Sequence, residues 1–297
     1  MPSILKDQKK DDLVLSGITI THPDRVISEI GHITKGELAK YYATVAPFLL
    51  KAIVGHPLSL LRCPDGINND CFYQRNPGQG LGPDVRPFQF KHKDKTYEYL
   101  YIDDKKGLME VVQMGAIELH PWGARVNNID YPDRPIFDLD PAPDVPFDAV
   151  KLAALDLHRR LKKRSLESFL KCTGGKGLHV TVPLAEKNTW DEVKTFGGTI
   201  AKEMVAAVPQ AYVATMSKAK RTGKIFVDFF RNDYAATGIA DFSVRARPGA
   251  PVAVPLDWDE LNRLKAGNQF TISDVLKRVT KSRPDVMRYK KRQKLPA

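Results

Sequence analysis

Hydrophobic residues recur at helical spacing in three long stretches of the chain. Thr34 and Glu37 have the Ser/Thr-x-x-Glu form of a capping box, and the apolar positions that follow them repeat every three to four residues. A helix is therefore predicted to begin at this point and to stop near Pro57. The same spacing predicts helices over residues 147–163 and 189–208, and the first of these two carries a strongly basic face.

Short runs of apolar, β-branched and aromatic residues predict strands around these helices. The predicted strands cover residues 57–61, 97–102, 116–120, 135–140, 168–173, 177–184 and 224–231. Residues 62–95 are rich in Gly, Pro, Asn and charged residues, so they are predicted to form long surface loops, which are usually functional in compact domains. Because helices are mixed with runs of strands and do not alternate regularly with them, we expect an α+β fold with mixed sheets.

Composition places the chain among ordinary globular proteins. Its 297 residues are 42% hydrophobic, which allows a sizeable core and excludes a disordered or fibrous chain. The longest apolar run has only a few residues, and residues 1–10 lack the apolar segment of an export signal, so neither a membrane span nor secretion is predicted. Cys63, Cys71 and Cys172 are too few and too scattered to indicate disulfides or zinc, which favours a reducing cytoplasm.

Net charge narrows the class of partner. The chain has 46 Lys and Arg against 35 Asp and Glu, a difference of +11. Basic surface gains affinity for polyanions such as nucleic acid by releasing counterions, although many basic proteins bind no nucleic acid. The basic residues over 288–294 are interpreted as a solvated end in preference to a phosphate-contacting arm. Charge therefore indicates a partner but no chemistry.

Three aspartates on two predicted strands are the strongest candidates for chemistry. Asp138 and Asp140 alternate along one strand, so both carboxylates project from the same face, roughly 7 Å apart along the backbone. Asp228 interrupts a strongly apolar strand and is costly there unless it is paired or liganded. Three carboxylates suit Mg²⁺ or Mn²⁺ and match a two-metal centre for phosphoryl transfer. The alternatives are exposed aspartates in a turn and a salt bridge from Asp228 to Arg231 or Arg245.

A glycine-rich turn between two predicted strands is a candidate phosphate site. The segment Thr173-Gly-Gly-Lys-Gly-Leu-His179 lets the backbone approach a ligand closely with free N–H groups. Lys176 would supply a point charge, Thr173 a hydroxyl and His179 a hydrogen-bond donor. The segment lacks the pattern of a Walker-type loop. A glycine-rich hairpin with incidental Lys and His is the alternative.

More cations flank the Asp228 strand. Arg221 ends a basic run just before it. After it, Ser243, Arg245 and Arg247 are predicted to share one strand face, an arrangement that suits a clamp on a triphosphate.

Two further features lie earlier in the chain. His120 stands where a predicted strand ends, a place in which a lone His is more often structural than functional. Phe72 and Tyr73 lie in a predicted loop between basic residues and could either stack on the bases of an unpaired strand or cover a core.

Four segments occur together in the order and spacing of a known family. They are His120-Pro-Trp-Gly-Ala-Arg125, Asp130-Tyr-Pro-Asp-Arg-Pro-Ile-Phe-Asp-Leu-Asp-Pro141, Gly174-Gly-Lys-Gly-Leu-His179 and the segment from Phe242 to Pro251. The set resembles the polymerase domain of bacterial DNA ligase D, a member of the archaeo-eukaryotic primase superfamily. The resemblance extends from about residue 19 to about residue 286. Each motif alone is weak or moderate, but the ordered set is specific.

The resemblance implies one primase-like domain over residues 1–297, with an RRM-type catalytic core. An amino-terminal portion to about residue 115 would pack on a core over about 116–260, followed by a helical tail over about 261–297. The implied activity is a nucleotidyltransferase that extends a primer 3′-hydroxyl at gaps and broken ends, prefers ribonucleotides and uses two Mn²⁺ or Mg²⁺ ions. The implied setting is bacterial non-homologous end joining at the nucleoid, with Ku and ligase and nuclease modules on 5′-phosphorylated DNA.

The resemblance also assigns site residues by position. Asp138, Asp140 and Asp228 would be the catalytic metal ligands. The residues expected to hold the nucleotide are His120, Thr173, Lys176, His179, Arg221, Arg245 and Arg247. The residues expected to contact DNA are Arg25, Lys35, Arg62, Phe72 and Tyr73, with Arg25 and Lys35 at a pocket for a downstream 5′-phosphate.

Two departures and three rival functions accompany this assignment. Thr173 stands where the family usually has Ser, and His22 stands where a residue of the 5′-phosphate pocket is often Asn. The rivals are a primase that starts chains de novo, a DNA-end-bridging protein without catalysis, and a metal-dependent nuclease. Lys176, Arg221 and Arg245 favour a triphosphate over the single scissile phosphate of a nuclease.

Overall fold

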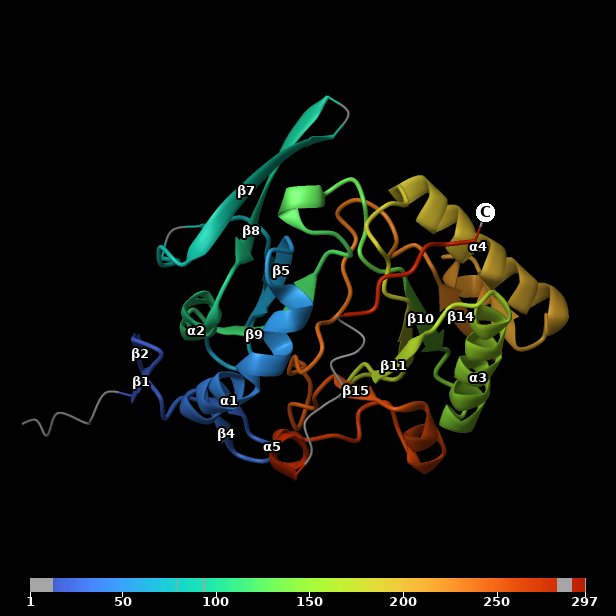
Figure 1. The fold of residues 1–297 in the computed structure, drawn as a ribbon. Coiled ribbons are helices and arrows are strands. Elements are labelled where there is room, and N and C mark those ends of the chain that lie inside the picture. The colour runs from blue at the N-terminus through green and yellow to red at the C-terminus, as the bar shows by residue number, and fades with distance from the viewer. Residues whose placement is uncertain (1–12, 79, 93, 282–289, 297) are drawn as a thin grey trace, which may run out of the picture.

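The computed structural model describes residues 13–78, 80–92, 94–281 and 290–296. Two β-sheets organise them, and helices pack beside each sheet (Figure 1). The expectation of no export signal in residues 1–10, and the part of the basic tail at residues 288–289, fall outside the described residues. No helix within the described ranges has the length and apolar character needed to cross a bilayer.

The first sheet is antiparallel and comes from the amino-terminal half of the chain. Its strands are β5 (Leu58–Arg62), β6 (Phe72–Gln74), β7 (Val85–His92), β8 (Lys95–Ile102) and β9 (Ala116–Pro121). They follow the order β6-β5-β8-β7, and β9 also pairs with β5. Helices α1 (Lys35–Ile53) and α2 (Lys105–Gln113) contact each other beside this sheet. Two small hairpins precede α1, made by β1 (Leu13–Leu15) with β2 (Ile18–Ile20) and by β3 (Val26–Ser28) with β4 (Ile33–Thr34).

The second sheet has six strands in the order β13-β14-β10-β12-β11-β15. The strands are β10 (Ile136–Pro141), β11 (Phe169–Cys172), β12 (Leu178–Thr181), β13 (Tyr212–Val213), β14 (Ile225–Asp228) and β15 (Val254–Leu256). All its pairs are antiparallel except β13 with β14, so the sheet is mixed, as predicted. Helices α3 (Phe147–Lys163) and α4 (Trp190–Ala207) pack beside it, and α5 (Ile272–Lys281) contacts α1. Short 3₁₀ turns cover Val126–Asn128, Lys218–Lys220 and Trp258–Arg263.

The helix starts follow from local capping. The Thr34 hydroxyl accepts a hydrogen bond from the Glu37 N–H, and the Glu37 carboxylate accepts one from the Thr34 N–H at 2.8 Å, which completes the predicted capping box of α1. Thr189 and Glu192 do the same for α4. Helix α1 ends at Ile53, four residues before the proline that was expected to stop it.

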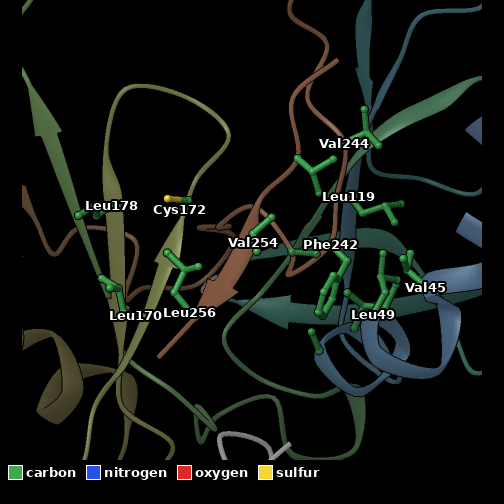
Figure 2. Packing of buried hydrophobic residues seen from close by; sticks show 14 of the residues in the cluster. Val45, Leu49, Leu119, Leu170, Cys172, Leu178, Phe242, Val244, Val254 and Leu256 are labelled. Atoms are coloured by element: carbon green, nitrogen blue, oxygen red, sulfur yellow. The ribbon is translucent and has the colours of Figure 1, made fainter. Parts of the chain in front are cut away.

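One apolar core connects the two sheets. Val45 and Leu49 of α1 pack toward Phe242, whose segment continues into β15 and the strands of the second sheet (Figure 2). Two buried tyrosines of α1 fix this connection, since the Tyr41 hydroxyl donates to the Phe242 carbonyl at 2.8 Å and the Tyr42 hydroxyl accepts from the Val244 N–H at 2.9 Å. The core therefore holds the second sheet against the amino-terminal elements.

A buried ionic group fixes the start of β10. Asp133 Oδ2 lies 3.0 Å from His56 Nε2, and Asp133 Oδ1 lies 3.1 Å from Arg134 Nε. Arg134 Nη2 also donates to the Ala52 carbonyl at the end of α1. Burial alone would raise the pKa of Asp133, but attraction to Arg134 and His56 holds that pKa below its usual range. The segment that enters β10 is thereby tied to the end of α1.

Two predictions for residues 62–95 are wrong. The stretch was expected to be loop, but it forms β6 and all of β7, which pairs with β8 over eight residue pairs. The proline and the charges of β7 hid the alternation of Phe88 and Phe90, which pair with Tyr99 and Tyr97 across the hairpin. Because β5 and β6 are antiparallel neighbours, Cys63 and Cys71 meet at one end of that pair and form a disulfide that was not predicted.

The carboxyl-terminal segment also differs from expectation over its described residues. The Gln293 side chain accepts a hydrogen bond from the Glu167 N–H at 2.8 Å, and the Ala185 N–H donates to the Gln293 carbonyl at 2.8 Å. Gln293 therefore attaches this segment to the rest of the fold by completing backbone hydrogen bonds, whereas the side chains of Lys290, Arg292 and Lys294 are exposed, as expected of a solvated end.

Candidate active site

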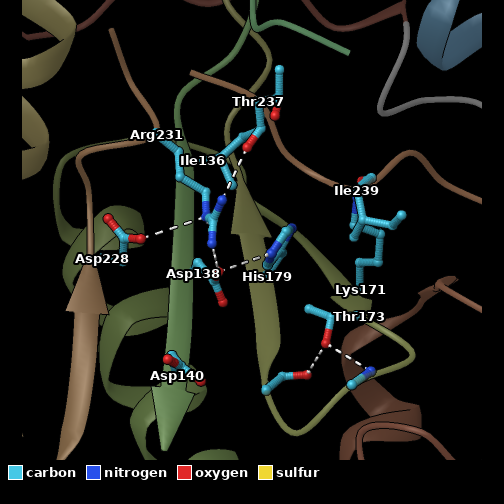
Figure 3. Close-up of polar contacts among 12 residues, drawn as sticks. Ile136, Asp138, Asp140, Lys171, Thr173, His179, Asp228, Arg231, Thr237 and Ile239 are labelled. Atoms are coloured by element: carbon cyan, nitrogen blue, oxygen red, sulfur yellow. Dashed lines mark hydrogen bonds and ion pairs between the residues drawn. The ribbon is translucent and has the colours of Figure 1, made fainter. Parts of the chain in front are cut away.

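The three predicted carboxylates lie on neighbouring strands of the second sheet. Asp138 on β10 is directly opposite Asp228 on β14, and Asp140 lies two residues further along β10 (Figure 3). Asp138 and Asp140 both line a cavity of about 240 Å³, which agrees with their predicted common face. Asp138 is buried, whereas the Asp140 side chain is 52% exposed at the cavity mouth. Strand β14 ends at Asp228, earlier than predicted.

Arg231 compensates the charge of Asp138, and His179 contacts the same carboxylate. Arg231 Nη2 lies 2.7 Å from Asp138 Oδ2, its Nε lies 3.5 Å from Asp228 Oδ2, and its Nη1 donates to the Thr237 carbonyl. His179 Nε2 lies 3.5 Å from the same Asp138 oxygen. Burial would raise the pKa of Asp138, but His179 and Arg231 outweigh it and hold the pKa below its usual range. The salt bridge from Asp228 to Arg231, left open by the sequence, is present.

Negative charge is less well balanced at the other two carboxylates. Burial, together with repulsion from Asp138, raises the pKa of Asp140 above its usual value. Burial also raises the pKa of Asp228, against the attraction of Arg231. Carboxylate oxygens that repel one another are the donor set that Mg²⁺ and Mn²⁺ prefer, so the chemistry of these residues fits a divalent cation. Over the described residues no three His, Cys, Asp or Glu side chains converge on one ion position, and Arg231 lies against two of the three carboxylates.

The glycine-rich turn borders the same cavity. The Thr173 hydroxyl donates to the Gly177 carbonyl at 3.0 Å and accepts from the Gly175 N–H at 3.1 Å, so it fastens both sides of the turn. A Cβ on Gly177 would come within 2.2 Å of the Leu139 carbonyl oxygen, which explains why glycine lies against β10 here. Lys176 is exposed and lines the cavity with Asp138 and Asp140.

Arg245 and Arg247 line the same cavity as the carboxylates, but they are not on the strand that was predicted to carry them. Their segment forms no strand beyond an isolated bridge at Val244. Ser243 is buried and accepts a hydrogen bond from the Leu119 N–H, so it does not share a face with the two arginines. The Ser243 hydroxyl is hydrogen-bonded to the backbone of β9, whereas the two arginines line the cavity.

Glu118 was missed by the sequence analysis. It is buried on β9, where its Oε2 lies 2.8 Å from His120 Nε2 and 3.1 Å from Arg245 Nε. Glu118 interrupts the apolar run Ala116-Ile-Glu-Leu in the same way that Asp228 interrupts its strand, so the sequence alone could have identified it. The sequence suggested Arg231 only as a salt-bridge partner of Asp228. In the structure Arg231 also lines the cavity.

Arg221 lies beside the cavity and not in it. Its Nη1 is 3.8 Å from Asp140 Oδ2, and its guanidinium stacks 3.8 Å above the centre of the Phe226 ring. A neighbouring groove is lined by Arg221, Lys218, Lys176 and Asp140. Lys176 and Asp140 belong to both hollows, so the groove continues the cavity toward the surface.

Arg25 and Lys35 lie together at the start of α1. The Lys35 N–H donates to the Arg25 carbonyl, and Lys35 Nζ donates to Gln113 Oε1 at 2.9 Å. Burial and the nearby Arg25 charge lower the pKa of Lys35 to about 8. Arg25 Nη1 donates to the Pro64 carbonyl at 2.6 Å. His22 precedes them, and its carbonyl accepts from the Arg25 N–H.

Phe72 and Tyr73 are exposed on β6. Their exposed fractions, 46% and 59%, exclude the alternative that they cover a core. The Arg62 guanidinium lies 5.1 Å from the centre of the Phe72 ring, while its Nε donates to the Met114 carbonyl. The Tyr73 ring meets the His120 ring edge-on, with 5.9 Å between centroids. The aromatic pair therefore borders the cavity through His120.

The hydroxyl of Thr173 generates a stability prediction. Thr173→Val should lower the free energy of unfolding by about 1–3 kcal/mol, because the buried Gly175 N–H loses its acceptor and the Gly177 carbonyl keeps only the 3.4 Å bond from the Thr173 N–H. Thr173→Ser keeps both hydrogen bonds and loses one methyl, worth about 0.8 kcal/mol. Urea unfolding of the two variants compares them directly. A valine variant at least as stable as the serine variant would show that the hydroxyl does not fasten the turn.

Comparisons with known proteins agree with this geometry. Residues 34–287 match the family model described as LigD, primase-polymerase domain. The structure is similar to that of the polymerase domain from Mycobacterium tuberculosis ligase D in complex with DNA, with a TM-score of 0.84 and 28% sequence identity, covering 91% of this chain and 96% of that one.

Curated relatives are longer than this chain. It is 37% identical over 264 residues to the multifunctional non-homologous end joining protein LigD of Pseudomonas aeruginosa, covering 89% of this chain and 31% of that protein. It is 30% identical over 246 residues to LigD of Mycolicibacterium smegmatis, covering 82% of this chain and 32% of that protein. The chain thus spans about a third of the length of these relatives. The family match, the identity and the shared mixed α+β fold establish that the chain belongs to the LigD primase-polymerase domain family.

Proposed function

We propose that the chain is a template-directed nucleotidyltransferase that extends a primer 3′-hydroxyl at gaps and broken DNA ends. The observation that carries the proposal is the composition of one cavity, which is lined by Asp138 and Asp140 together with Lys176, Arg245 and Arg247. Acidic oxygens and cations in one cavity are what the transfer of a nucleotide from its triphosphate requires. Membership of the primase-polymerase family supports the same class of reaction.

The side chains divide the work of this reaction. Asp138, Asp140 and Asp228 would hold two Mn²⁺ or Mg²⁺ ions, which supply activation of the 3′-hydroxyl and neutralisation of phosphate charge. Lys176 and Arg247, both exposed at the cavity, would bind triphosphate oxygens. The acceleration would come from positioning and electrostatics, with no protein nucleophile.

The glycine-rich turn would act through its backbone. Thr173 has both hydrogen-bonding directions committed to Gly175 and Gly177, so its contribution is to keep the turn's shape against β10. Lys176 then projects from a fixed backbone toward the cavity. His179, whose pKa is lowered to about 4 by burial, is neutral near pH 7 and keeps Asp138 in place.

The setting we propose is bacterial non-homologous end joining. The named relatives are end-joining proteins, and the similar solved structure is of a polymerase domain bound to DNA. Exposed Phe72 and Tyr73 would stack on template or primer bases, and Arg25 with Lys35 would bind a downstream 5′-phosphate. Ku and ligase and nuclease modules are the proposed partners, and ribonucleotides are the preferred substrate.

Removal of the carboxylates tests the catalytic proposal. Asp138→Ala and Asp228→Ala should each lower single-nucleotide addition to a gapped duplex by about 100-fold or more, because the charge that orients the reacting groups is lost. Asp148→Ala is the matched control, since this aspartate is exposed on α3, pairs with Lys151 and lines neither the cavity nor the neighbouring groove, and it should stay within about two-fold of wild type.

Three outcomes separate the rival functions in the same assay. No addition by wild type with either metal, together with DNA-end bridging that both substitutions and EDTA leave intact, contradicts the metal-dependent transferase and favours a bridging protein without catalysis. Products formed from single-stranded template without primer indicate a de novo primase. Shortened substrate strands indicate a nuclease.

Lys35 generates a pH prediction for the 5′-phosphate. Wild type should extend a gap with a 5′-phosphate about ten-fold more efficiently than one with a 5′-hydroxyl, and Lys35→Ala should lose most of that preference. The lowered pKa means that Lys35 is charged below about pH 8 and neutral above it, so the preference should be full at pH 7 and decline toward pH 9. Lys40→Ala, an exposed lysine on the same helix, should keep the preference.

A preference that persists in Lys35→Ala at every pH would place the 5′-phosphate elsewhere.

A further inference from the structure

Glu118 joins two segments that meet at the proposed nucleotide cavity, strand β9 and the loop that carries Arg245. Its side chain is only 4% exposed. Oε1 accepts a hydrogen bond from the Ala246 N–H at 2.8 Å, and Oε2 lies 2.8 Å from His120 Nε2 and 3.1 Å from Arg245 Nε. One carboxylate therefore fixes the loop that carries Arg245 against the end of β9.

The charge of Glu118 determines what its neighbours present to a ligand. Burial would raise its pKa, but the His120 hydrogen bond and the Arg245 charge lower that pKa to about 2. An ionised carboxylate only accepts hydrogen bonds, so the hydrogen between the two groups belongs to His120 Nε2. Burial lowers the pKa of His120 as well, so the ring is neutral and its Nδ1 carries a lone pair.

His120 therefore enters the cavity as an acceptor. It lines the cavity, and among the described residues its Nδ1 makes no hydrogen bond. A phosphate group of a triphosphate offers acceptor oxygens at neutral pH and no complementary hydrogen. A sugar hydroxyl or a base amine does offer one.

Arg245 is oriented by the same carboxylate. Besides the ion pair through Nε, its Nη1 donates to the Thr173 carbonyl at 2.7 Å, so the guanidinium spans from β9 to the glycine-rich turn. Because Arg245 lines the cavity, the remaining N–H groups of its guanidinium are available to bind an anion there.

We propose that Glu118 is a positioning residue for nucleotide binding, which sets His120 as the acceptor for a hydroxyl or amine of the nucleotide and holds Arg245 for its triphosphate. The inference rests on the proposed function, and it reassigns His120 from a general nucleotide ligand to one that contacts sugar or base. Because Glu118 acts in the ground state and the transition state alike, its removal affects nucleotide affinity more than turnover.

Glu118→Gln tests the proposal, with Glu98→Gln as the control on the exposed part of β8. The amide nitrogen that replaces one oxygen cannot accept from His120 or pair with Arg245. We expect the Kd of ATP, measured by calorimetry in Mg²⁺ buffer, and the KM for ATP in single-nucleotide addition to rise about ten-fold. The kcat should stay within about three-fold, and Glu98→Gln should match wild type. An unchanged Kd in Glu118→Gln, or a loss confined to kcat, overturns the inference.

The wild-type protein supplies a second readout that needs no variant. The ¹⁵N spectrum of the His120 ring should show hydrogen at Nε2 and none at Nδ1, and hydrogen at Nδ1 overturns the inference. The proposed function fails separately, if wild type neither binds ATP nor extends a primer. If wild type binds ATP and extends a primer, and Glu118→Gln has the same Kd and KM for ATP, the inference about Glu118 is wrong and the proposed function still holds.

Discussion

Burial of negative charge is the constraint on which this structure depends. Asp133, Asp138 and Glu118 are all buried, and each would be neutral or unstable without a cation beside it. Arg231 pairs with Asp138 and Arg245 pairs with Glu118, in both cases from a distant segment, whereas the arginine that pairs with Asp133 is its chain neighbour Arg134. Asp133 also contacts His56, which follows α1. These contacts help determine how α1, β9, β10 and the loops after β14 meet.

The same pairs give the cavity its polarity. Arg231 neutralises the deep carboxylate, which leaves Asp140 at the mouth with a raised pKa and with Arg221 3.8 Å away as its ion-pair partner. Lys176 of the glycine-rich turn and two arginines of the 245–247 loop line the same cavity. A basic protein thus keeps a small acidic centre beside several cations, an arrangement that would favour a polyanion and, in the proposed reaction, would hold the reacting phosphate near the carboxylates.

Much of the fold and site followed from local sequence signals. The capping box at Thr34 began α1, and alternation placed Asp138 and Asp140 on one face of β10. Features that depend on strand pairing could not be predicted in this way. The Cys63–Cys71 disulfide required β6 to be found beside β5, and the second role of Arg231, on Asp138, required β14 to lie opposite β10. Glu118 was visible as a polar residue in an apolar strand, but its partner Arg245 lies 127 residues later in the chain.

The central claim is that the carboxylate cluster binds the divalent cation of a nucleotide-transfer reaction. Electron paramagnetic resonance of free Mn²⁺ during titration with wild-type protein and with Asp138→Asn measures this binding without any turnover. The account predicts that wild type removes free Mn²⁺ signal, more so with ATP present, and that Asp138→Asn removes much less. Equal Mn²⁺ binding by the two proteins would contradict it.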